Sequence, residues 1–210
     1  MSTTHTDFGW QTTAPGNGHS GGALAQFLVD RIRRLDHVAD ICDLGCGNGH
    51  LSGQLSAQGF RLTGIDGSAT GIRLARQTYP NVTFVEELID RNMTARANLG
   101  DFDLVVSSDV IEHLYRPADL IEAALSVLRP GGQILIGTPY HGYLKNLALS
   151  LSGKMDSHFS VLHTGGHIKF FSVHTLSELI QSYGFKDLSF SFYGRAPYLW
   201  KNMICHARRA

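Results

Sequence analysis

The chain has 210 residues, enough for one domain with its own core, and 43% of them are hydrophobic, as in an ordinary globular protein. Its 18 basic residues balance 18 acidic ones, so no net field attracts a polyanion, which counts against a nucleic-acid partner without excluding one. No run of about 18 apolar residues is present, so no membrane span is expected.

The first part of the chain predicts a tail and then a helix. We expect residues 1–20, rich in Ser, Thr, Gly and His, to form a flexible tail, and residues 21–210 to form a single domain. The polar start lacks the pattern of a secretory signal, and three cysteines offer no paired framework, so we expect a cytoplasmic protein. Apolar side chains at helical spacing over residues 23–35 predict a helix before the first strand.

The most informative stretch is a strand followed by a glycine-rich turn. The apolar run 38–44 predicts a buried strand with Asp43 near its carboxyl end, where ligands of open α/β sheets bind. Glycines at three alternate positions follow, and they allow tight turns and close approach of a ligand. Apolar residues from Leu51 onward then predict a helix, whose first N–H groups are free to bind. The three glycines are Gly45, Gly47 and Gly49.

A second apolar run ends in another acid, in the sequence Gly64-Ile65-Asp66-Gly67. An acid at the end of the second strand can accept hydrogen bonds from both ribose hydroxyls of a nucleoside. The glycine spacing is Gly-x-Gly-x-Gly, which is neither the pattern of dinucleotide-binding proteins nor a P-loop. A plain strand-to-helix turn and a nicotinamide site are the alternatives.

Residues 43–49 and 64–66 together resemble the cofactor site of class I S-adenosylmethionine-dependent methyltransferases, and the resemblance extends over residues 20–206. It implies an α/β, Rossmann-like seven-stranded sheet, mostly parallel with an antiparallel C-terminal edge strand, and helices on both faces. It also implies S-adenosylmethionine as cofactor, with Glu87 beside adenine. The implied cofactor-binding residues are Asp43, Gly45, Cys46, Gly47, Gly49, Asp66, Gly67, Glu87 and Ser108.

Periodicity and turn residues predict the remaining elements. Residues 139–167 interrupt the alternation of strands and helices, and we interpret them as a substrate-side lid with aromatic side chains. The other predicted elements are helices over 69–79, 89–100, 120–128 and 172–183, and strands over 82–85, 102–107, 133–137, 188–193 and 202–206.

Residues 109–113 form a second candidate site, with the sequence Asp-Val-Ile-Glu-His. If a helical turn begins at Asp109, then Asp109, Glu112 and His113 share one face just beyond the fourth strand. Two carboxylates with imidazoles suit a divalent metal ion. The alternatives are a metal-free site, in which His113 is the general base beside Glu112, and a purely structural Glu-His pair.

The same residues resemble a pattern in two groups of methyltransferases. Ubiquinone-pathway O-methyltransferases and small-RNA 3′-terminal 2′-O-methyltransferases have an acid, then two further residues, and then a Glu-His pair. The RNA enzymes add a histidine just before a Lys-Phe pair, which here matches the segment His167-Ile168-Lys169-Phe170. The resemblance implies that Asp109, Glu112, His113 and His167 hold a divalent metal (Mg, Mn or Zn) that grips the acceptor. Asp109 stands where a Glu is usual.

The sequence therefore predicts a methyltransferase that O-methylates a small-molecule hydroxyl on an aromatic or polyol-like acceptor, with His113 and Glu112 as catalytic residues. An RNA 2′-O-methyltransferase is one alternative, and a cofactor-binding regulatory protein without turnover is another. No oligomeric state is predicted.

Overall fold

The computed structural model describes residues 21–90, 92–93, 99–159, 162 and 165–210. The predicted tail and most of the predicted helix over 89–100 lie outside the described residues. The strands are β1 (Asp40–Leu44), β2 (Arg61–Asp66), β3 (Thr83–Glu86), β4 (Phe102–Ser108), β5 (Leu128–Pro139), β6 (Phe185–Tyr193) and β7 (Asn202–Arg209). The helices are α1 (Gly21–Ile32), α2 (His50–Ser56), α3 (Ala69–Thr78), α5 (Ala118–Val127), α6 (Tyr143–Leu151), α7 (Met155–Phe159) and α8 (Val173–Ser182), with a 3₁₀ turn η2 (Ile111–His113).

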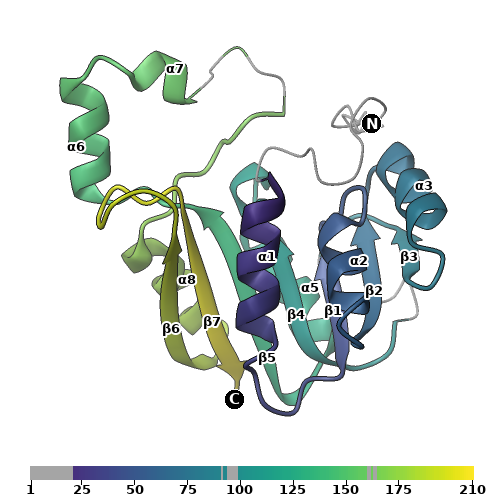
Figure 1. The fold of residues 1–210 in the computed structure, drawn as a ribbon. Helices are drawn as coiled ribbons and strands as arrows, with labels where there is room; N and C mark the ends of the chain where they lie inside the picture. Colours follow the sequence, from purple (N-terminus) through teal and green to yellow (C-terminus); the bar gives the residue numbers. More distant parts are fainter. Residues whose placement is uncertain (1–20, 91, 94–98, 160–161, 163–164) are drawn as a thin grey trace.

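The strands form one sheet in the order β3-β2-β1-β4-β5-β7-β6 (Figure 1). Strands β1 to β5 are parallel, and β7 pairs antiparallel with both β5 and β6. The predicted seven-stranded, mostly parallel sheet is confirmed, with the antiparallel strand β7 inserted between β5 and the edge strand β6. The strand order reverses between β1 and β4, so the carboxyl ends of these two strands mark the switch point where ligands of such sheets bind.

Helices cover both faces of the sheet, with α1 and α2 on one face and α5 and α8 on the other (Figure 1). Successive side chains of the central strand β4 point to opposite faces of the sheet, as they do in any β-strand. Leu104 packs with the residues of α1, and Val105 packs with the residues of α5 and α8. The apolar runs in the sequence are therefore central strands that are buried on both faces.

Two strands, β5 and β6, begin several residues earlier than the sequence predicts. Strand β5 begins at Leu128 instead of residue 133, because Leu128 already pairs with Phe102 before a register shift. Gly131, at φ 73°, allows the irregular backbone of that shift. Strand β6 begins at Phe185 and contains a second register shift, where Asp187 has φ 56°. In both places a bulge lengthens the strand beyond its apolar run.

Helices α6 and α7 project beyond the sheet above the ends of β5 and β7 (Figure 1). They occupy the segment that was predicted as a lid. None of the helices in the described ranges is long and apolar enough to cross a membrane.

Candidate active site

The glycine turn after β1 requires glycine for two separate reasons. Gly45, Gly47 and Gly49 have φ values of 82°, 53° and 77°, which side chains disfavour. A Cβ on Gly45 would lie 2.2 Å from a methyl carbon of Val110, and one on Gly49 would lie 2.7 Å from the ring of Phe84. The turn is thus packed closely on its inner side.

Asp66 fixes the position of this turn. Its Oδ2 accepts a hydrogen bond from the Gly47 N–H at 2.9 Å, and its Oδ1 accepts one from the Ser68 N–H at 2.8 Å. The backbone N–H groups of Gly45 and Cys46 both donate to the Ile65 carbonyl, at 2.7 and 3.1 Å. The ends of β1 and β2 therefore form one unit, with a half-buried carboxylate beside the turn.

Asp43 lies beneath the turn, and its side chain is almost fully buried at 2% exposure. Its Oδ2 accepts a hydrogen bond of 2.6 Å from the hydroxyl of Ser52 on α2. Burial raises the pKa of Asp43 to about 7, because the charged form is poorly solvated there. Asp43 therefore links β1 to the helix behind the turn, and Cys46 is buried beside it.

The other predicted cofactor residues lie along the same edge of the sheet. The Glu87 N–H donates to the Asp66 carbonyl at 3.0 Å, and the half-buried Glu87 carboxylate accepts from the Leu88 N–H at 2.8 Å. A Cβ on Gly67 would meet Leu88 at 2.9 Å. Ser108 ends β4, so the ends of the four strands β1 to β4 bring the predicted residues together.

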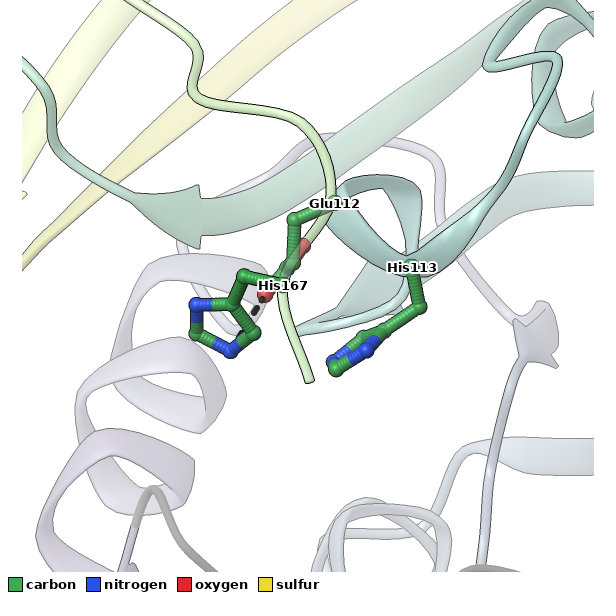
Figure 2. A group of neighbouring side chains, drawn as sticks. All are labelled: Glu112, His113 and His167. Carbon is green, nitrogen blue, oxygen red and sulfur yellow. Dashed lines mark ion pairs between the residues drawn. The ribbon is translucent and has the colours of Figure 1, made fainter. Parts of the chain in front are cut away.

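A second group joins residues from two distant segments. Glu112 and His113 lie in the 3₁₀ turn η2, and His167 follows α7 (Figure 2). The possible ligand atoms of these three side chains lie within 4.8 Å of one another. The segment that carries His167 is held in place because the N–H groups of Ile168 and Lys169 donate to the Glu112 carbonyl, at 2.9 and 3.0 Å.

The Glu112 carboxylate is only half satisfied, although its side chain is 1% exposed. Its Oε2 accepts a hydrogen bond from the Thr138 hydroxyl at 2.9 Å. Its Oε1 has no hydrogen-bond partner in the part of the chain that the structure describes, and His167 Nε2 lies 3.9 Å away. Burial, and then the negative charge of Asp109, raise the pKa of Glu112 to about 8. A cation at Oε1 would relieve both effects.

His113 is oriented by a backbone carbonyl. Its Nδ1 lies 3.2 Å from the Gly166 oxygen, and because that oxygen can only accept, Nδ1 carries the proton. The Nε2 atom is then the acceptor, free of a proton, as metal ligands and general bases both require. The His113 and His167 rings meet edge to face at 4.8 Å.

Asp109 is not a member of this group. The predicted helical turn from Asp109 is wrong, because Asp109 has φ 55° and its N–H continues the ladder to the Gly137 carbonyl at 2.9 Å. Its Oδ1 accepts a hydrogen bond from Asn202 at 3.0 Å. Thr138, which contacts Glu112, and Asn202, which contacts Asp109, belong to no sequence motif, because sheet pairing alone brings them to these positions.

Comparisons with known proteins agree with this geometry. A family model described as a methyltransferase domain matches residues 19–189. The ubiquinone biosynthesis O-methyltransferase of Caulobacter vibrioides is 34% identical over 139 residues, covering 62% of this chain and 53% of that protein. The enzyme of the same name from Hydrogenovibrio crunogenus is 28% identical over 162 residues, covering 74% and 66%. The chain spans about half the length of the first curated relatives that it matches.

Solved structures show the same fold. Magnesium protoporphyrin IX methyltransferase from Synechocystis PCC 6803, with bound SAH, has a TM-score of 0.65 at 20% identity, over 90% of this chain and 82% of that one. A SAM-dependent methyltransferase from Archaeoglobus fulgidus has a TM-score of 0.63 at 17% identity, over 88% and 94%. The chain belongs to the methyltransferase domain family, and its fold is that of the class I S-adenosylmethionine-dependent methyltransferases.

Proposed function

We propose that this protein transfers the methyl group of S-adenosylmethionine to a hydroxyl of a small molecule, beside a divalent cation held by Glu112, His113 and His167. The observation that carries the proposal is that His113 and His167 lie close to the Glu112 carboxylate, one oxygen of which has no hydrogen-bond partner among the described residues. The curated relatives are named O-methyltransferases, which agrees with an oxygen acceptor.

The cofactor would lie along the ends of β1 to β4. In this proposal Asp66 accepts hydrogen bonds from the ribose hydroxyls, because each oxygen of a carboxylate can accept more than one hydrogen bond. Glu87 takes the adenine amine, and Ser108 faces the methyl group from the end of β4. Asp43 acts through Ser52 and the turn, because its own side chain is buried.

The residues fit a divalent ion in their chemistry. One carboxylate oxygen and two imidazoles make a mixed donor set, which suits Zn²⁺ or Mn²⁺ better than Mg²⁺. When bound, such an ion lowers the pKa of a nearby hydroxyl and helps to orient it. Thr138 holds the second oxygen of Glu112, and the Gly166 carbonyl holds His113, so the donors are positioned in advance.

The reaction forms a bond between carbon and oxygen, breaks the bond between the methyl carbon and sulfur, and releases one proton from the hydroxyl. The sulfonium is already activated, so the main task of the protein is to align the acceptor and remove that proton. In the metal-free route, His113 Nε2 accepts the proton. Where His113 ligates a cation, its lone pair is engaged, and the proton of the acidified hydroxyl would pass to solvent. Residues 139–167 would cover the acceptor as a lid, with Phe159 and Phe170 excluding water.

The decisive experiment combines binding, metal analysis and turnover. We expect S-adenosylhomocysteine to bind in a calorimetric titration, and elemental analysis to find a divalent metal in the purified protein. Catechol should accept a labelled methyl group, and treatment with a chelator should abolish this transfer until metal is restored. Transfer that resists the chelator would leave His113 as a base without metal. Cofactor binding with no acceptor methylated, RNA included, would indicate a regulatory protein.

A further inference from the structure

Helix α6 has an inverted distribution of side chains. Its apolar residues Tyr143, Leu144 and Leu151 are exposed, whereas Lys145 in the same helix is buried, at 4% exposure. A lysine is almost never fully buried unless it is paired, because its ammonium group loses hydration. The position of Lys145 therefore needs a chemical reason.

The contacts of Lys145 within the protein do not neutralise its charge. Its Nζ donates to the Tyr140 carbonyl at 2.6 Å, which uses one of three N–H groups. In the described part of the chain, Lys145 makes no ion pair with a carboxylate. Burial, and then the charge of Arg195, lower the pKa of Lys145 to about 8, so it remains largely charged at neutral pH.

His141 is a second buried polar group at the same place. Its side chain is 7% exposed, and its Nδ1 has no hydrogen-bond partner among the described residues. The His141 ring stacks on Phe159 at 5.8 Å and meets Phe170 at 5.0 Å and His158 at 5.6 Å. Phe159 and Phe170 contact each other at 4.8 Å, so an aromatic wall adjoins the basic groups.

The charges that act on this cluster are all positive. Burial and the charge of Lys145 lower the pKa of His141 to about 4, with a smaller contribution from His158, an opposing one from a hydrogen bond with Asn146, and a further small lowering from His167. Burial, Lys145 and Arg195 likewise lower the pKa of His158. The short segment 168–171 joins the cluster to the Glu112 site, because the Ile168 N–H donates to the Glu112 carbonyl at 2.9 Å and the His141 N–H donates to the Phe171 carbonyl at 3.0 Å. Arg195 lies in the turn between β6 and β7, and this turn is joined to the residues before α6, because the Tyr140 N–H donates to the Lys201 carbonyl at 2.9 Å.

We propose that His141, Lys145, His158 and Arg195 form an anion subsite, which binds a carboxylate on the aromatic ring of the methyl acceptor. A carboxylate would accept from Lys145 and from the unpartnered His141 nitrogen, and the acceptor ring would lie against Phe159 and Phe170. The inference rests on the proposed function, because it assigns this anion to the molecule that is methylated at the Glu112 site. It narrows the acceptor to hydroxylated aromatic acids.

The test measures binding of benzoate and of benzyl alcohol, two rings that differ in charge, to protein saturated with S-adenosylhomocysteine. Ligand-observed NMR titration compares the wild type with Lys145→Met, Arg195→Gln and the control Lys154→Met, which removes an exposed lysine nearby. We expect Lys145→Met to weaken benzoate binding roughly 10-fold to 100-fold, since a charged hydrogen bond is lost. Arg195→Gln should weaken it about 3-fold, because an exposed charge is screened. Lys154→Met should change nothing, and benzyl alcohol should bind all four proteins alike.

Equal affinity of the wild type for benzoate and benzyl alcohol would overturn the subsite, and so would unchanged benzoate binding in Lys145→Met. Arg195→Gln changes only an exposed turn residue, so it tests the charge cluster even if Lys145→Met does not fold. Turnover of 3,4-dihydroxybenzoate against catechol separates the two proposals. A carboxylate-dependent binding pattern without any methyl transfer would leave the subsite standing and refute the proposed function.

Discussion

The two halves of the ligand-binding edge are assembled in different ways. The cofactor half comes from residues 43–87, which are close together in the sequence and follow β1, β2 and β3 in turn. The acceptor half collects η2, Thr138 on β5, and His167 beyond α7. A short motif can encode the first half, whereas the second depends on pairings between distant segments.

The carboxylates of the two halves also differ in how completely the protein supplies their hydrogen-bond partners. Asp66 is satisfied by backbone N–H groups on both oxygens and keeps its place without a ligand. Glu112 has one oxygen without a partner among the described residues, and its pKa is raised to about 8. In the proposed sites, Asp66 is therefore positioned before the cofactor binds, whereas a bound cation would supply the missing partner of Glu112.

The largest expected effect lies in the acceptor half. Glu112→Gln combined with His113→Ala should lower the rate of methyl transfer by about 100-fold to 10,000-fold, since it removes two of the three proposed metal ligands or, in the metal-free route, the base. Binding of S-adenosylhomocysteine should stay unchanged by calorimetry. His174→Ala is the matched control, because that histidine is exposed on α8 beside Glu178. Full activity of the double variant would make the pair structural.

Gly45→Ala tests where the two halves touch, because the new Cβ would meet Val110, next to η2. We expect the free energy of unfolding to fall by about 3 kcal/mol, from left-handed strain together with overpacking. Gly131→Ala is the control, with a similar φ of 73° and no atom within 4 Å of the new Cβ. It should cost only about 1 kcal/mol. Equal losses in urea denaturation would show that the Val110 contact is unimportant.

Asp66→Ala should weaken S-adenosylhomocysteine binding roughly 10-fold to 100-fold, because charged hydrogen bonds to the ribose are lost and the turn is loosened. The measurement is a calorimetric titration at fixed ionic strength. Asp101→Ala removes an exposed acid before β4 and should leave affinity as it is. Unchanged affinity in Asp66→Ala would refute this placement of the cofactor.

The smallest expected effect concerns the buried acid of the cofactor half. The pKa of Asp43 is about 7 in the folded protein against an ordinary 3.8, so the folded state favours the protonated form. Stability contributed through this group is present at low pH and is lost as pH rises from about 4 to 7. The free energy of unfolding of Asp43→Asn, measured relative to that of the wild type, should therefore be about 2 kcal/mol higher at pH 8 than at pH 5. Denaturation curves at both pH values check this, and an equal difference at the two would contradict it.

The sequence predicted the elements whose cause is local. Ser172 caps α8 through a capping box with Thr175, as its position before an apolar helix indicated. The central strands were recognisable because apolar runs of that length must be buried. The group of Glu112, His113 and His167 was predicted from a resemblance, and the structure brings the three together.

The rest depends on the tertiary structure. The left-handed φ of Asp109 follows from its position between β4 and η2. The spacing of the residues therefore could not show that Asp109 lies outside the group of Glu112, His113 and His167. The aromatic residues in and near the predicted lid also differ in burial: Tyr140 packs against Trp200, while Tyr143 and Tyr198 are exposed. Nor did any pattern show that Lys145, rather than its apolar neighbours, faces inward.

The position of β7 has a consequence for the order of folding. β5 pairs with β7, and β7 with β6, so the acceptor side of the sheet closes only after residues 202–209 have been synthesised. The parallel strands β1 to β4 pair earlier in the chain and need no part of that segment. A ribosome-bound chain arrested before residue 202 would therefore expose one edge of β5, where chaperones or a misplaced strand can bind.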